Sequence, residues 1–136
     1  MLQTMNVKSN TKEKFHVITI NEPLLAANMT AEIENRLLGC LQGDVKNVVL
    51  NCEDIKMLDD AAAETLVKIQ QTYYENNASF VICSLQPAVE AALDKTGLLE
   101  IMNVTPTESE AWDIIQMEEI ERELMDNDNP DLNLEL

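Results

Sequence analysis

The stretch VVLNCEDIKMLDDAAAETLVKI, residues 48–69, decides the fold of this 136-residue chain. It opens on a short apolar, valine-rich run, which is typical of a buried strand. A polar loop follows, and Asp59 or Asp60 then stands where a helix N-cap is expected. From Ala61 to about Asn76 the apolar residues recur at helical spacing. The apolar face of this predicted helix consists of Ala62, Leu66, Ile69 and Tyr73.

Similar units lie on either side of this stretch. Apolar, β-branched runs at 15–20 and 79–83 predict two further strands, and Leu24-Leu25 a short one. Helical patterns precede and follow them, with apolar stripes at Ile33, Leu37 and Leu41, at Val89, Leu93 and Thr96, and at Ala111, Ile114, Ile115 and Leu124. Thr107-Glu108-Ser109-Glu110 has the capping-box pattern that opens the last helix. This alternation predicts one α/β domain with a partly parallel sheet.

The charge of the chain limits its partners. Nine basic and 25 acidic residues give a formal net charge of −16, which repels nucleic acid and anionic membrane surfaces. No apolar run approaches the roughly 18 residues of a membrane helix, so no membrane insertion is expected. The beginning of the chain has no apolar signal-peptide segment, which favours a cytoplasmic location.

Composition along the chain divides it into three parts. We expect a flexible N-terminal lead at 1–14, a folded domain at 15–125 and an acidic tail at 126–136. The leucines of the tail alternate at 132, 134 and 136, so the tail is either a docking arm or a solubilising end.

The residue types needed for catalysis are scarce. His16 is the only histidine, Cys40, Cys52 and Cys83 form no metal-binding spacing, and three glycines provide no phosphate-binding loop. The loop acids Glu53, Asp54, Asp59 and Asp60 suggest a Mg²⁺ or Ca²⁺ site, but a solvated acidic loop explains them better. We therefore expect no catalytic residue, no cofactor and no metal, and a chain that is not an enzyme.

Residues 48–102 resemble a STAS domain, the fold of anti-sigma-factor antagonists and their relatives. Such domains have an apolar strand, a loop, an Asp-Ser-Ser-Gly-like turn, a long helix, and later a helix that ends in a Thr-Gly-Leu-like corner. Here the corner matches Thr96-Gly97-Leu98, and the resemblance extends over about 15–117. It implies a mixed β-sheet with about four helices mainly on one face. It also implies partner binding through the loop–helix junction, which consists of Met57, Leu58, Asp59, Asp60, Ala61 and Ala62.

Position 60 departs from the family pattern. In many STAS proteins a serine at this position is phosphorylated by a partner kinase, and the added charge ends binding. An ungapped match places Asp59 on the family's Asp, Asp60 on that serine, Ala61 on the next serine and Ala62 on the glycine. No phosphorylation is expected at Asp60. Its carboxylate either imitates the phosphorylated state in part or only caps the helix.

Met57 and Leu58 precede the junction and admit two interpretations. Met57 is either an exposed apolar anchor for a partner or part of the core, whereas Leu58 is better interpreted as core.

The resemblance implies a protein–protein interaction regulator of the anti-sigma-factor-antagonist type, acting in signalling and transcription regulation. Its partner would be an anti-sigma factor or kinase, and homo-oligomerisation stays open. Two alternatives remain: an accessory subunit of a transport complex, and a metal-dependent enzyme that uses the acidic loop.

Overall fold

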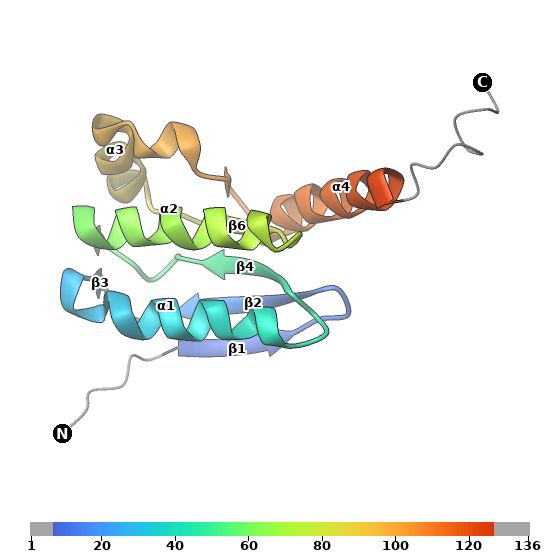
Figure 1. Ribbon diagram of the computed structural model, residues 1–136. Helices are drawn as coiled ribbons and strands as arrows, with labels where there is room; N and C mark the ends of the chain where they lie inside the picture. The colour runs from blue at the N-terminus through green and yellow to red at the C-terminus, as the bar shows by residue number, and fades with distance from the viewer. Residues whose placement is uncertain (1–6, 127–136) are drawn as a thin grey trace.

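The computed structural model describes residues 7–126, with side chains through residue 125, and contains a five-stranded mixed sheet (Figure 1). The strands lie in the order β1-β2-β4-β6-β7. Only β1 runs antiparallel to its neighbour, and the other pairs are parallel. Their bounds are β1 Val7–Thr11, β2 Phe15–Ile20, β4 Asn47–Asn51, β6 Phe80–Cys83 and β7 Val104–Thr105. The predicted α/β fold with a mixed sheet is confirmed.

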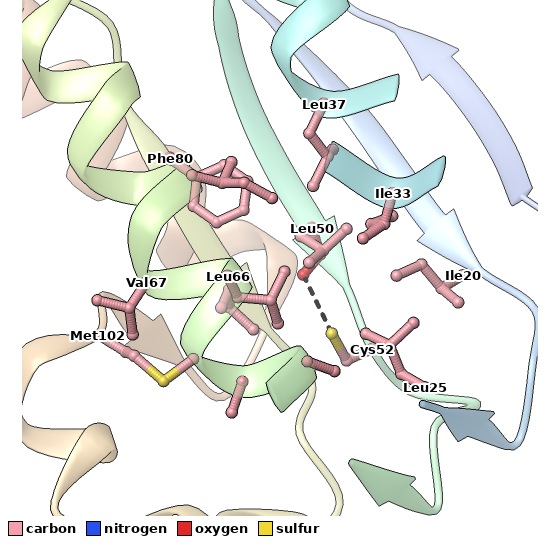
Figure 2. Close-up of a cluster of buried hydrophobic side chains, with 14 of the residues drawn as sticks. Ile20, Leu25, Ile33, Leu37, Leu50, Cys52, Leu66, Val67, Phe80 and Met102 are labelled. Atoms are coloured by element: carbon pink, nitrogen blue, oxygen red, sulfur yellow. Dashed lines mark hydrogen bonds between the residues drawn. The ribbon is translucent and has the colours of Figure 1, made fainter. Parts of the chain in front are cut away.

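Helices cover both faces of the sheet, but unequally. The helices are α1 Thr30–Gly39, α2 Asp60–Glu75, α3 Pro87–Thr96 and α4 Glu108–Asp126, with single-turn segments η1 Ala27–Met29, η2 Cys40–Gln42 and η3 Leu98–Ile101. One buried cluster joins the first three helices to Ile18, Leu50 and Ile82, which are aligned across three strands. Figure 2 shows part of this cluster, with Leu66 and Leu37 facing the strand that carries Leu50.

A smaller cluster lies on the opposite face of the sheet, under α4. It is built on Val17, Val49 and Val81, which are also aligned across β2, β4 and β6. Ala111 and Ile115 of α4 complete it, and the Trp112 ring stacks on Phe15 with 4.8 Å between ring centroids. Three of the four helices therefore share one face, as the STAS resemblance implies.

Several local predictions are confirmed. Helix α2 begins at Asp60, and the four residues of its predicted apolar face are buried. Thr107 Oγ1 accepts the Glu110 N–H at 3.2 Å, which is the N-cap half of the predicted capping box. Gly97 ends α3 with φ = +80°, in the left-handed region that a glycine adopts without strain.

Other predictions differ from the structure. Residues 7–11, expected within a loose lead, form β1 and pair with β2, because the edge of β2 offers backbone partners to a polar segment that has little strand propensity of its own. Leu124, expected inward, is exposed, since polar side chains of α4 face the sheet at that level. Thr96 is also exposed. The tail predicted at 126–136 lies outside the described residues, apart from Asp126 at the end of α4.

Candidate functional site

A second, two-stranded sheet positions the loop–helix junction. Strand β5, Met57–Leu58, pairs in parallel with β3, Leu24–Leu25, so that Met57 lies beside Leu24. The carbonyl of Pro23 accepts the N–H groups of Lys56 at 2.7 Å and of Met57 at 3.0 Å. These backbone bonds hold the loop between β4 and α2 against the segment that follows β2.

Asp59 joins two surface segments. It occupies the N-cap position of α2 with an extended backbone, but its carboxylate makes no capping hydrogen bond to that helix. Asp59 Oδ2 instead accepts the N–H of Ala27, the first residue of η1, at 3.0 Å, and the Asp59 N–H donates to the Leu25 carbonyl at 3.0 Å. Asp59 therefore lies at the predicted N-cap position, but its carboxylate accepts the Ala27 N–H of η1 and not an N–H of α2.

Asp60 presents a charge to solvent. It is the first residue of α2, it is exposed, and within residues 7–126 its carboxylate has no hydrogen bond or ion pair. The positive end of the helix dipole favours a carboxylate there by about 0.3–1 kcal/mol. Apart from that contribution, no interaction of the Asp60 side chain with residues 7–126 stabilises the fold.

The six predicted junction residues divide between surface and core. Met57, Asp60 and Ala61 are exposed, with 63% of Met57 accessible. Ala62 is buried and Leu58 packs against the main core, which confirms the core interpretation of Leu58. The structure adds Leu24, 39% exposed, beside Met57. Sequence reasoning missed this role for Leu24, because a two-residue strand carries no signal of which strand it pairs with.

The acidic loop before the junction is held by polar contacts of its own. Asp54 Oδ2 accepts the Asn21 side-chain amide at 2.8 Å, and the Glu53 carbonyl accepts the Gln86 amide at 2.7 Å. In the described range, 7–126, no three His, Cys, Asp or Glu residues are grouped so that they could hold a metal ion. The arrangement offers a divalent cation no ready set of ligands.

The side chains of His16 and Cys52, which could be reactive, are held by contacts within the fold. The two ring nitrogens of His16 are hydrogen-bonded to Thr11 Oγ1 and to the Val45 carbonyl, each at 2.8 Å. Burial raises the pKa of the Cys52 thiol, with a smaller contribution from Cys83, so that Cys52 stays protonated and unreactive at neutral pH. These groups lie within the fold and are not exposed beside the junction.

The chain belongs to the STAS domain family, whose model matches residues 6–111. That range contains the whole sheet, the junction and the first turn of α4. No helix within residues 7–126 has both the length and the apolar character that spanning a membrane requires.

Solved structures with the same fold include regulators and part of a transporter. An anti-sigma-factor antagonist (STAS) domain protein from Planctomyces limnophilus is 20% identical, with a TM-score of 0.69 over 83% of this chain and 99% of that one. The anti-sigma factor antagonist SpoIIAA in its unphosphorylated form is 18% identical, with a TM-score of 0.65 over 82% and 96%. The murine anion transporter Slc26a9 is 15% identical, with a TM-score of 0.70 over 85% of this chain but 23% of that one.

Proposed function

We propose that this protein is a regulator that docks another protein, of the anti-sigma-factor type, through the start of α2. One observation supports this most directly: Asp60, whose carboxylate has no partner among residues 7–126, begins α2 three residues after Met57, which is exposed and pairs with the exposed Leu24. Exposed apolar side chains beside a charge are typical of a docking surface, because the apolar groups supply affinity and the charge supplies selectivity. On this proposal the chain performs no catalysis.

Asp60 would set the binding state permanently. A phosphoserine carries a charge of about −1.5 to −2, whereas Asp carries −1 on a shorter side chain. The Bacillus protein SpoIIAA has a solved phosphorylated form with this fold, which shows that the fold accommodates a phosphate. In the present chain Asp60, which the STAS resemblance aligns with the phosphorylated serine, would reproduce part of that charge without a kinase. The proposed consequence is weak binding to a partner that prefers an uncharged junction.

The test compares partner affinity among three forms of the full chain. Wild type, Asp60→Ser and Asp60→Ala are titrated with each purified anti-sigma factor of the source organism, and phosphate transfer from ATP is followed at residue 60. Both variants should bind one of these factors about tenfold or more tightly than wild type, and only the Ser variant should be labelled. Asp94→Ser, on the exposed side of α3, is the matched control and should behave as wild type. Equal binding by all forms would contradict the regulatory role of Asp60.

A transport-complex subunit is the second candidate function. It is favoured by the match to one section, 23%, of the longer chain of the anion transporter Slc26a9. Binding to a membrane transporter, with no response to Asp60→Ser for any anti-sigma factor, would support it. The acidic-loop enzyme has less support, because Asp54 and Asp59 are each bonded to a different protein group.

A further inference from the structure

Helix α4 carries a second apolar stripe on the side that faces away from the sheet. At about 100° per residue, Met117, Ile120 and Leu124 lie on one side of the helix, opposite Ile115. These three side chains are 62%, 57% and 58% exposed. Their spacing of three and four residues is that of an amphipathic packing face, yet within residues 7–126 nothing covers it. An exposed stripe of this kind is typical of an interaction surface.

The sheet-facing side of the same helix is already satisfied without these residues. Ala111 and Ile115 fill the small core, and farther along, Glu118, Glu119 and Arg122 bond polar groups of the body. The apolar residues of this half of α4 therefore contribute little to the fold. A groove of about 340 Å³ adjoins the stripe at Ile120, and its lining includes Trp112, Glu123 and Glu119, whose carboxylate pairs with Lys14 at 3.9 Å. The stripe thus adjoins a hollow that could receive side chains of a partner.

Charge selects the occupant of this surface. Glu121 and Glu123 flank the stripe on its two sides, and Arg122 is the only cation of α4. A second copy of this chain would bring the same acids against one another, and residues 127–136 are acidic as well. A helix with an apolar stripe bordered by Lys or Arg would match both the shape and the sign of the charge.

We infer that the outer face of α4, formed by Met117, Ile120 and Leu124 between Glu121 and Glu123, docks a cationic amphipathic helix of another protein. This surface is separate from the junction at the start of α2, since α4 lies toward the C-terminal end of α2 (Figure 1). The protein would thereby hold two partners, or two parts of one partner, at the same time. Methionine suits such a surface, because its flexible side chain adapts to different partner side chains.

The test uses two synthetic Leu/Lys peptides of about 18 residues with identical composition. In one peptide the leucines form a single helical stripe, and in the other they are scrambled around the helix. Binding to the full chain is followed by the fluorescence of Trp112, the only tryptophan, which lines the groove. The striped peptide should bind about tenfold or more tightly than the scrambled one. Equal affinities would mean attraction by charge alone and would overturn the inference.

A matched pair of variants locates the binding. Ile120→Asn should weaken the striped peptide about tenfold, whereas Ile101→Asn, which replaces an isoleucine that is 54% exposed on η3, should leave it unchanged. Asp60→Ala should also leave it unchanged, so failure here is distinct from failure of the proposed junction site. If Ile120→Asn binds the striped peptide as tightly as wild type does, the inference is overturned. Two further results would overturn it. Sedimentation could show a wild-type dimer that Ile120→Asn abolishes, which would make a second copy of the chain the occupant. Replacing Leu132, Leu134 and Leu136 by Asn could raise the peptide affinity tenfold, which would make the chain's own C-terminal segment the occupant.

Discussion

The two ends of α2 are constructed in different ways. At the N-terminal end, Asp60 and Met57 face solvent, and the carboxylate of Asp60 has no partner among residues 7–126. At the C-terminal end, Tyr74 Oη donates to Glu118 Oε1 at 2.8 Å, and buried Asn47 lies in the same polar network. Every buried side-chain polar atom in the described chain has a hydrogen-bond partner. The N-terminal end, here called the open end, therefore leaves the Asp60 carboxylate exposed to solvent, whereas the C-terminal end, the closed end, uses its polar groups to hold the fold together.

The largest expected effect is on stability at the closed end. Asn47 donates to the Lys14 carbonyl and Glu119 Oε2, and its Oδ1 accepts the Ser79 N–H and an Arg122 N–H. Asn47→Ala should lower the free energy of unfolding by about 2–4 kcal/mol, because one buried and three part-buried hydrogen bonds are lost together. Urea unfolding measures the change.

Asn51 provides the control for that measurement, since it lies at the other end of the same strand. Its side chain accepts one N–H, that of Glu53, at 2.9 Å. Asn51→Ala should therefore cost only about 0.5–1.5 kcal/mol. Equal losses for the two alanine variants would contradict the division between a closed end and an open end.

The second expected effect is a pH dependence that comes from Tyr73. Burial raises its pKa above the ordinary value of 10.0, with a smaller contribution from Cys40, and its hydroxyl donates to the Leu37 carbonyl. The unfolded chain ionises this phenol near pH 10 while the folded chain keeps it neutral, so the stabilisation is complete below pH 10 and is lost as the pH rises above it.

Tyr73→Phe isolates this contribution. Between about pH 10 and 11 the free energy of unfolding of wild type should fall by about 1 kcal/mol more than that of the variant, and the difference in slope should approach about 1.4 kcal/mol per pH unit above pH 11. Urea unfolding at several pH values measures both slopes. Parallel slopes would show that Tyr73 ionises equally in the folded and unfolded chains.

A smaller effect is expected at Asp60. Asp60→Ala should lower the free energy of unfolding by about 0.3–1 kcal/mol, because the substitution removes a favourable interaction with the helix dipole but no hydrogen bond. Asp59→Ala, one residue earlier, should cost more, about 1–1.5 kcal/mol, since it breaks the bond to the Ala27 N–H. Thermal and urea unfolding of both variants give the order, and a larger loss at Asp60 would reveal a structural role for that carboxylate.

The smallest effect on stability is expected at Met57. Because 63% of its side chain is exposed, Met57→Ser should change the free energy of unfolding by less than about 0.5 kcal/mol. Partner binding through the junction should nevertheless weaken about tenfold. A variant that is clearly destabilised would show that Met57 is part of the core, the other interpretation of its sequence position.

The periodic elements could be predicted from the sequence, but the contacts between distant segments could not. The α2 stripe through Leu66 and Ile69 and the strand at 47–51 follow from local spacing alone. The bond from Asp59 to the Ala27 N–H joins residues 32 positions apart, and nothing at either position indicates its partner. The location of the junction came from the STAS resemblance and not from residue chemistry.

Polar residues are the other reason why sequence-based predictions differ from the structure. Asn47 and Ser79 look like strand ends in the sequence, yet they anchor the second half of α4. Because their hydrogen bonds replace apolar contacts with the sheet there, the hydrophobic pattern of α4 predicts the wrong side at Leu124. Strand β1 was missed for a related reason, since backbone pairing with β2 and not side-chain pattern forms it.

The cover that α4 provides also has a consequence for synthesis of the protein. The three helices over the larger cluster precede α4 along the chain, so that face of the sheet can close while translation continues. The opposite face cannot close until Ala111 and Ile115 of α4 have been synthesised, because these residues cover Val17, Val49 and Val81. At roughly 5–20 residues per second, the ribosome needs about two to seven seconds to pass from position 81 to position 115. During that interval the nascent chain bears a row of uncovered valines, and it is then that a ribosome-associated chaperone would find its binding site.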